Sequence, residues 1–270
     1  MEQLLRMKHS QNNYDNQMAL IEDDNVNVSS TNDAKDFVIL CGGIIGLVLI
    51  FLLAFDYVFG FVIDSMPRGK LLKIESFFTF NCESNINNKY KKELATLERI
   101  KYYIMHNDKS IQNTSDFDIK VVENKEVNAM VYPNGSIIFT SGLLDKKLSE
   151  QELAFVLAHE MGHYANRDHL KSISKQVAVI ILSLATGQSS HVSSIAHGVS
   201  ETEFLTHSRN QERKADLYAG SMLIKIYGTN EGGKQFIKRI QENEKTPEFI
   251  HYFSTHPSWN QRVKLLNSQR

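Results

Sequence analysis

The sequence predicts an α+β fold, mainly helical with a small sheet and an edge strand, behind one N-terminal transmembrane helix. Three observations support this prediction. Residues 37–55 form an uncharged apolar run, residues 127–142 have the pattern of a β-hairpin, and residues 149–170 have the pattern of a long helix. The chain of 270 residues is 42% hydrophobic, which is enough to bury a core in one large domain or two small ones.

Composition limits the classes of function. The formal net charge is −1 and the sequence pI is about 6.8, so no nucleic-acid partner is predicted. The two cysteines, Cys41 and Cys82, form no C-x-x-C pair, so a metal would have to be held by histidine and carboxylate side chains. The sequence does not indicate an oligomeric state.

The N-terminal part divides into a tail and an anchor. Residues 1–36 are polar and rich in Asn, Gln, Asp and Ser, which predicts a disordered tail. Residues 37–63 predict a transmembrane anchor, because the first 19 carry no charge and nearly span a bilayer at about 1.5 Å per residue. A second apolar piece follows Asp56. A buried core helix is the alternative, but the run is apolar on all faces.

Basic residues near the anchor indicate its orientation. Lys35 precedes the apolar run, whereas Arg68, Lys70 and Lys73 follow it. The single apolar run predicts a single-pass protein in the lipid bilayer. The positive-inside rule then predicts that its large C-terminal part lies on the cytoplasmic side. Residues 64–87 are predicted to be a linker.

Residues 88–270 have the patterns of a folded domain. Residues 117–123 predict a strand, and Asn134-Gly135 is a strong turn signal between two β-prone runs. Apolar residues at helical spacing predict a helix ahead of them, with charges on its other face: Leu94, Leu97, Ile100 and Ile104.

The motif HExxH lies at residues 159–163 within the predicted long helix. Ser149 and Glu152 form a capping box that starts this helix. His159 and His163 are four residues apart, so both imidazoles project from one face and can hold one metal ion. Glu160 borders that face and suits a general base. The alternative is a helix with two half-exposed histidines.

A zinc ion held by two imidazoles needs a third protein ligand and an open position for water. The helix-like stretch SRNQERKADLYAGSMLIKIYG supplies Glu212 as the predicted third ligand, with Gly228 as a plausible helix end. Asp216 lies one turn further on, where it could accept the free ring N–H of a ligand histidine. The alternative for this carboxylate pair is a solvated helix face.

Four stretches together resemble one protein family. They are LAHEMGHYANRDH, QERKAD, VNAMVYPNGSIIFTSGLL and STHPSWNQRVKLL, and they cover roughly residues 90–267. They look like the membrane zinc endopeptidases of the HtpX and CAAX prenyl protease type. The resemblance implies a zincin-like metalloprotease domain with one zinc ion per chain, held by His159, His163 and Glu212, and with Glu160 as the catalytic base.

The resemblance also matches Asp216 to the Asp of the family motif E-x-x-A-D. Many multi-span relatives carry membrane helices between the second and third ligands. The apolar stretch VAVIILSLA is too short to cross a bilayer, and this departure argues against the multi-span subtypes, including prenyl-protein processing.

The implied reaction is hydrolysis of a polypeptide by water that the metal activates. Charge that develops on the carbonyl oxygen needs a donor, and His256 or Arg262 could supply it. The alternative for His256 is a loop histidine before a proline. An extended substrate could pair with an edge strand at residues 127–132, and Asn128, Ala129 and Met130 would contact it. The alternative is an ordinary core hairpin.

The leading prediction is a membrane-anchored zinc endopeptidase in membrane or envelope protein quality control. Alternatives are a catalytically weak, metal-binding chaperone-like module and a zinc hydrolase acting on non-peptide amides. Residues 186–200, rich in Ser and Gly, are predicted to form a lid over the cleft. His191 or His197 in it could occupy the open metal position, although two solvent-exposed loop histidines are the alternative.

Overall fold

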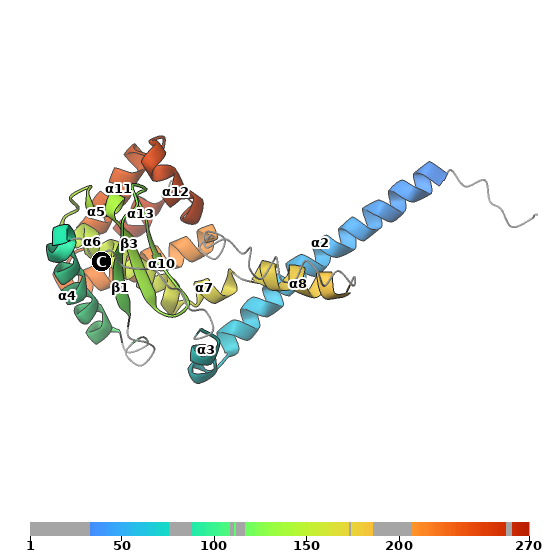
Figure 1. Ribbon diagram of the computed structural model, residues 1–270, viewed down its shortest axis with the longest axis horizontal. Coiled ribbons are helices and arrows are strands. Elements are labelled where there is room, and N and C mark those ends of the chain that lie inside the picture. Colours follow the sequence, from blue (N-terminus) through green and yellow to red (C-terminus); the bar gives the residue numbers. More distant parts are fainter. Residues whose placement is uncertain are drawn as a thin grey trace, which may run out of the picture. The chain divides into compact units, whose positions relative to one another are not determined.

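A computed structural model describes most of the chain (Figure 1). The described residues are 33–75, 88–108, 111, 117–172, 174–185, 207–257 and 261–269. They belong to two compact units that divide between Phe51 and Leu52. Residues 1–32 of the predicted tail and residues 76–87 of the predicted linker lie outside the described residues.

The predicted anchor is part of helix α2 (Asp33–Ser65). Asp33 and Asp36, which were predicted to belong to the tail, lie in the first turn of this helix, where negative charge is favourable. Among the described residues, α2 is the helix long and apolar enough to cross a membrane. Its length of about 50 Å exceeds a bilayer core of about 30 Å.

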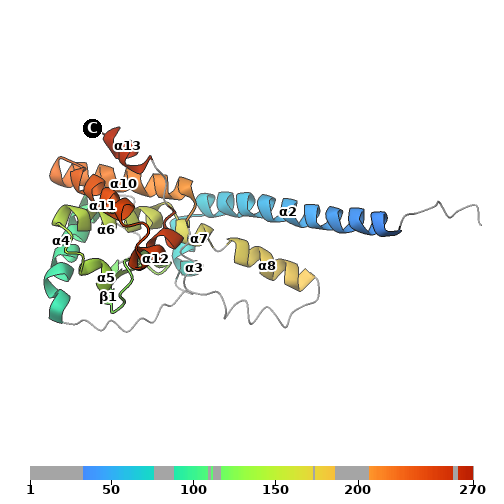
Figure 2. The same cartoon turned by 90° about the horizontal axis from the view of Figure 1, so that it is seen from above.

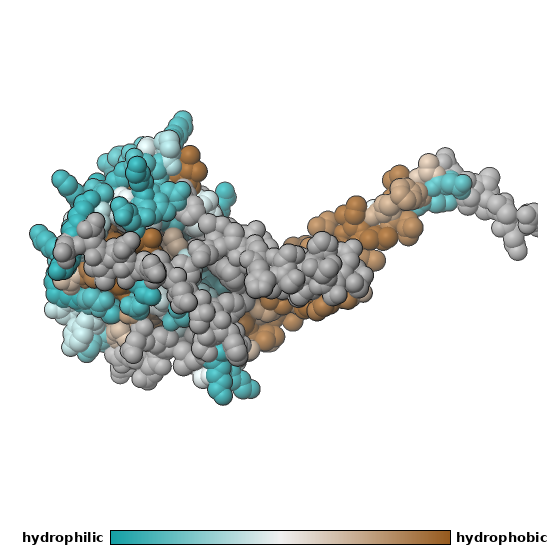
Figure 3. All heavy atoms as spheres, viewed as in Figure 1, coloured by the Kyte–Doolittle hydropathy of each residue, from teal (hydrophilic) through white to brown (hydrophobic). Residues whose placement is uncertain are grey.

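Large apolar side chains of α2 are exposed along its length. The exposed fractions of Leu40, Leu47 and Leu53 are 62%, 69% and 73%. Figure 3 shows this helix as a mostly brown, hydrophobic surface, whereas teal, hydrophilic residues cover much of the coloured surface elsewhere. The predicted linker contains a second helix, α3 (Arg68–Glu75).

The helix predicted from apolar spacing is α4 (Lys91–Asn107), which follows a short turn of helix, η1 (Asn88–Tyr90). Leu97, Ile100 and Ile104 are fully buried on one face, as the pattern predicts. This face packs against α6, the helix that carries the HExxH motif.

A small mixed sheet has the order β1-β3-β2. Strand β1 (Asp118–Val122) runs parallel to β3 (Ser136–Thr140), and β2 (Ala129–Val131) runs antiparallel to it. The predicted hairpin is therefore confirmed, with Gly135 at a φ of 86°, a value that glycine adopts readily. Within the described part of the chain, β2 pairs with one strand and forms an edge.

Most of the remaining elements of the domain are helices (Figures 1 and 2). They are α5 (Ser141–Leu144), α6 (Glu150–Ala165), α7 (Asp168–Lys171), α8 (Ser174–Ala185), α10 (Arg209–Tyr227), α11 (Glu231–Glu242), α12 (Pro247–Thr255) and α13 (Arg262–Asn267). Helix α6 is buried from Glu152 to Tyr164 and packs against α4, α10, α11 and β2. The domain is mostly helical with a small mixed sheet.

Close packing between α6 and α10 explains the glycine inside the HExxH motif. A Cβ on Gly162 would lie 3.1 Å from Cδ1 of the Tyr218 ring, which is tighter than an ordinary contact. The close neighbour is thus a side chain of α10. Gly162 therefore lets the two metal-facing helices approach each other.

Candidate metal centre

Helix α6 carries the HExxH side chains into the core. The helix begins at the predicted capping box, in which Ser149 and Glu152 satisfy each other's backbone N–H groups. His159, Glu160 and His163 are at most 2% exposed. Burying a polar group without a hydrogen-bond partner lowers the stability of the fold, so these side chains need hydrogen-bond or ion-pair partners from other elements.

Helix α10 supplies carboxylates from the opposite side. It begins at a second capping box, formed by Ser208 and Gln211, and ends at Gly228, which has a φ of 72° as a helix stop requires. Glu212 and Asp216 lie on the face toward α6, and neither is exposed. The alternative of a solvated helix face is therefore wrong for this pair.

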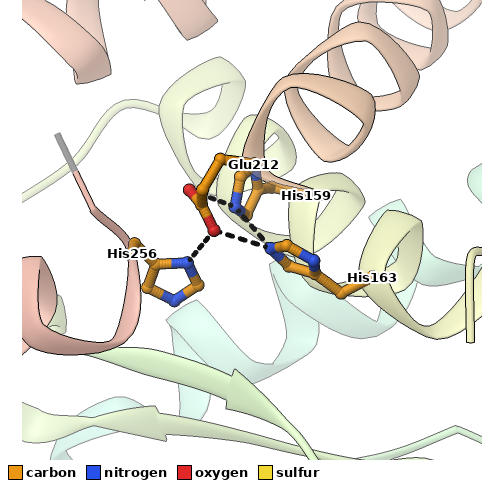
Figure 4. A group of neighbouring side chains, drawn as sticks. All are labelled: His159, His163, Glu212 and His256. Atoms are coloured by element: carbon orange, nitrogen blue, oxygen red, sulfur yellow. Dashed lines mark hydrogen bonds and ion pairs between the residues drawn. The ribbon is translucent and has the colours of Figure 1, made fainter. Parts of the chain in front are cut away.

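Four side chains converge between these helices: His159, His163, Glu212 and His256 (Figure 4). Their potential ligand atoms all lie within 4.8 Å of one another. The Nε2 atoms of His159 and His163 are 3.1 Å apart. Glu212 Oε1 lies 3.1 Å from His163 Nε2, and Glu212 Oε2 lies 3.5 Å from His159 Nε2.

This donor set fits a zinc ion. Ligand atoms about 2.0–2.1 Å from a tetrahedral zinc lie roughly 3.3 Å from each other, which is close to the spacings among the three predicted ligands. Among the described residues, Glu212 Oε2 is buried and has no hydrogen-bond partner, so it can bind a cation. Two imidazoles and one carboxylate also match the ligand chemistry of zinc.

A second layer of carboxylates holds the histidine rings. Asp216 Oδ1 lies 3.1 Å from His159 Nδ1, the position predicted for it. Asp168 Oδ2 lies 2.9 Å from His163 Nδ1 and was not predicted. Both carboxylates are buried. Such partners fix the tautomer and orientation of a metal-binding imidazole.

Arg262 contacts one of these carboxylates, that of Asp216. Its Nε and Nη2 donate to the two carboxylate oxygens of Asp216 at 2.7 Å and 2.6 Å. The guanidinium is 1% exposed, and its Nη1 lies 3.6 Å from Glu212 Oε2. Burial opposes the charge of Arg262, but Asp216 outweighs this effect and keeps the pKa well above its usual value. The bidentate pair with Asp216 favours a positioning role over direct contact with substrate.

The electrostatics of the metal-free centre favour protonated imidazoles. Burial lowers the pKa of His163, but Asp168 and Glu212 outweigh it and raise the pKa to about 10. The pKa of His159 is raised because Glu212 likewise outweighs burial. Burial opposes ionisation of Glu212, yet His256 and His159 hold its pKa well below the usual value. A metal must therefore displace protons from the imidazoles.

His256 connects the metal-facing carboxylate to the sheet. Its Nδ1 lies 3.1 Å from Glu212 Oε1, and its Nε2 lies 3.4 Å from the carbonyl oxygen of Ala129 in β2. Glu160 Oε1 is 3.6 Å from the same Nε2. His256 directly follows α12 and precedes Pro257, as in the alternative of a loop histidine, but its imidazole is buried, with an exposed fraction of 1%.

Glu160 lies beside the metal-facing atoms without joining them. It is not among the four converging side chains. Its Oε2 is buried and has no hydrogen-bond partner in the described part of the chain. This carboxylate oxygen is available to accept a proton.

The predicted substrate strand lies at the same place. Asn128 O accepts from Thr140 N, and Tyr132 N donates to Ser136 O, so alternate residues pair with β3. The backbone groups of Ala129 therefore point away from β3, where its carbonyl oxygen lies beside His256 Nε2. The side chain of Asn128 is fully buried, its Oδ1 accepts from Ala129 N, and its Nδ2 has no hydrogen-bond partner among the described residues. Met130 is half-buried.

His207 is a further residue that sequence reasoning missed. Its ring stacks on His163 with centroids 3.8 Å apart and an interplanar angle of 10°. Burial is the main reason that its pKa lies well below the usual value. His207 stands directly before the Ser208 cap and belongs to no recognised sequence motif. The predicted lid with His191 and His197 lies outside the described residues and stays a prediction.

Known proteins share this sequence pattern. Residues 92–270 match the model of peptidase family M48. The chain is 31% identical over 150 residues to the mitochondrial metalloendopeptidase OMA1 of Arabidopsis thaliana, which is 56% of this chain and 31% of that protein. It is 30% identical over 122 residues to the metalloprotease YcaL of Escherichia coli, covering 42% of this chain and 46% of YcaL.

A third relative is the mitochondrial metalloendopeptidase OMA1 of Schizosaccharomyces pombe, 29% identical over 160 residues. That match covers 56% of this chain and 45% of the relative, so the chain spans less than half of each of these three proteins. The buried His and Glu cluster and the family match define a metallopeptidase domain. The chain belongs to peptidase family M48.

Proposed function

We propose that the chain is a membrane-anchored zinc endopeptidase with a zincin-like domain and one zinc ion per chain. His159, His163 and Glu212 bind the metal. The observation that carries this proposal is the convergence of two imidazole nitrogens and the Glu212 carboxylate at spacings that fit a tetrahedral ion. The three relatives are metalloendopeptidases or metalloproteases by name, which supports hydrolysis of peptide bonds.

Glu160 is the general base of this reaction. Zinc bound in the centre would lower the pKa of a water molecule and polarise the scissile carbonyl. Glu160 takes the proton from the attacking water and passes it to the leaving amine. Its buried Oε2 without a hydrogen-bond partner among the described residues supports this role, because that oxygen can accept the proton without breaking an existing bond.

His256 supplies the donor for the carbonyl oxygen of the substrate. Its Nε2 lies between Glu160 and the Ala129 carbonyl, which are the proposed base and the proposed substrate strand. A donor at that position can stabilise the negative charge that develops during attack. Arg262 acts less directly, since its guanidinium holds Asp216.

The edge of β2 binds the substrate backbone. Ala129 directs its backbone groups away from β3, and an extended peptide would add there as a further strand by taking over the N–H now bonded to Asn128 Oδ1 and the carbonyl oxygen beside His256 Nε2. Asn128 orders this edge through its bond to Ala129 N, and Met130 completes the strand. Side chains of the peptide would then set sequence preference.

Residues 37–63 of α2 anchor the chain in a lipid bilayer in a single pass. Exposed apolar side chains along the helix support this proposal, since water is an unfavourable solvent for them. Arg68, Lys70 and Lys73 support a cytoplasmic side for the domain of residues 88–270. Substrates are membrane or envelope proteins that need removal, and the HtpX-type branch of the family suits such a role.

Digestion of casein by the full-length protein in detergent micelles tests this function. We expect internal cleavage products, identified by mass spectrometry, that a zinc chelator abolishes and added zinc restores. Failure to cut casein while short non-peptide amides are hydrolysed would favour the amidase alternative. Stoichiometric zinc with suppression of client aggregation, but with no hydrolysis, would favour the chaperone-like alternative.

A further inference from the structure

The turn that follows the HExxH helix has an unusual backbone. Arg167 lies between α6 and α7 with φ 61° and ψ 26°, in the left-handed region. Glycine adopts this region readily, whereas a residue with a Cβ rarely does. An arginine in this conformation therefore indicates that its side chain has a role that a glycine could not fill.

The guanidinium of Arg167 holds the end of α2. Its Nη1 donates to the carbonyl oxygens of Ile63, Asp64 and Met66 at 2.5, 2.9 and 3.0 Å. The last carbonyls of a helix have no partner within the helix and favour a nearby positive charge. Helix α2 has no basic residue in its own last turn, so Arg167 supplies that charge from another element.

Further contacts make this junction part of the folded domain. Lys171 Nζ lies 2.7 Å from Asp64 Oδ1. Ile63, Leu71 and Leu170 form a small buried cluster beside it, with exposed fractions of 4% or less. The last turn of α2 is thus packed and hydrogen-bonded against α7.

The next residue along the chain, Asp168, supports the metal centre. Its carboxylate lies 2.9 Å from His163 Nδ1, and both groups are buried. The left-handed turn at Arg167 sends two consecutive side chains to different partners, one to the end of α2 and one to the metal-facing histidine. A rotation of the backbone at this residue would displace both contacts.

We infer that Arg167 is a positioning residue, which makes the last turn of α2 a structural support for His163. The inference rests on the proposed zinc centre. It implies that the anchor and the metal centre are coupled, because any shift of the α2 end is passed through Arg167 to Asp168. Coupling of this kind is reciprocal, so metal binding also stabilises the junction.

Zinc affinity of the full-length protein in detergent micelles tests this inference without measuring activity. Arg167→Gly removes the guanidinium but keeps a residue that accepts the left-handed turn. We expect it to weaken zinc binding about tenfold in competition with a chromophoric chelator, at the lower end of the effect of outer-sphere changes. Arg99→Ala is the control. It also removes a guanidinium, one that lies 2.8 Å from the Glu150 carboxylate, and it should leave the zinc affinity unchanged.

A double-mutant cycle separates positioning from general destabilisation. If Arg167 acts through Asp168, then Arg167→Gly combined with Asp168→Asn binds zinc no more weakly than Asp168→Asn alone. Arg167→Lys retains the charge and should recover part of the affinity lost in Arg167→Gly. Unchanged affinity in Arg167→Gly, additive losses in the double variant, or no recovery with lysine would each overturn the inference.

Two further outcomes keep this test separate from the proposed function. Wild-type protein that binds zinc in the expected pattern but hydrolyses no peptide would contradict the proposed activity and leave Arg167 as a positioning residue. Normal hydrolysis with equal zinc affinity in Arg167→Gly would overturn this inference alone. Loss of cooperative unfolding in both Arg167 variants would also overturn it, because the role would then concern the whole domain.

Discussion

Helices α2 and α6 are both rich in apolar residues, but their surroundings differ. Leu47 in α2 is 69% exposed, whereas Leu157 in α6 is fully buried. Helix α6 packs against α4, α10, α11 and β2 and buries two histidines and two glutamates among its apolar neighbours. Most large apolar side chains of α2 are exposed, whereas the polar side chains of the α6 motif are buried and contact groups of other helices.

The contrast shows that hydrophobicity alone does not define what a helix does. An apolar helix whose side chains point outward requires an apolar solvent, which a bilayer supplies. An apolar helix that buries His159, Glu160 and His163 requires charged partners, which α10 supplies as Glu212 and Asp216. The following predictions test this contrast from the largest effect to the smallest.

Removal of the α10 ligand should have the largest effect. Glu212→Ala should leave no stoichiometric zinc on the purified protein, because it removes the carboxylate on the metal-facing side of the two imidazoles, and two imidazoles alone hold zinc poorly. Metal analysis after gel filtration measures the result. Glu231→Ala, which removes an exposed glutamate paired with Lys234, is the control. Full zinc occupancy in Glu212→Ala would mean that the ligand set is wrong.

The same substitution in the two helices should differ strongly. Leu157→Ala should lower the free energy of unfolding by about 2–5 kcal/mol, because it leaves a cavity in the core. Leu47→Ala should change it by less than about 0.5 kcal/mol, since its side chain has no protein core to leave. Denaturant titration in detergent measures both. Equal losses at the two positions would show that α2 is a buried core helix.

Removal of the Asp216 carboxylate, which contacts the predicted ligand His159, should have an intermediate effect. Asp216→Asn should weaken zinc binding about 10–100-fold, as the lost carboxylate no longer orients His159. The variant also leaves the buried Arg262 with a neutral partner, so thermal stability should fall as well. Chelator competition measures the affinity, with the exposed Asp118→Asn as control. An unchanged affinity would show that Asp216 serves packing alone.

The capping box should have the smallest effect. Ser149→Ala should lower the free energy of unfolding by about 1 kcal/mol, because the backbone N–H of Glu152 loses its acceptor at the start of α6. Zinc affinity should not change, since the cap lies far along the helix from the motif. A combined loss of stability and of zinc affinity would mean that the start of α6 also positions the histidines.

Much of this site could be predicted from local spacing. The i, i+4 histidines, the capping box at Ser149 and the glycine after Tyr227 each specify local geometry within a few residues. Asp168 could not be found this way, because its approach to His163 depends on the left-handed turn at Arg167. That turn is held by contacts more than 100 residues away in sequence.

The role of Arg262 was equally beyond local patterns. It was predicted as a donor for the substrate, but the structure pairs it with Asp216, which is 46 residues away. The choice between a substrate contact and an internal ion pair depends on how α13 packs against α10, and no spacing within either helix encodes that packing. The hairpin, by contrast, followed from one Asn-Gly turn between two short β-prone runs.

Return of zinc to metal-free protein tests the central claim most directly. Wild type and Glu160→Gln are stripped with chelator, titrated with zinc, and compared for cleavage of an internally quenched peptide at equal occupancy. We expect wild-type activity to rise in proportion to zinc and to saturate at one ion per chain. Glu160→Gln should bind the same zinc but cleave at least about 100-fold more slowly, the usual cost of losing a general base. Equal cleavage by the two proteins, or wild-type cleavage that does not follow zinc, would contradict the account.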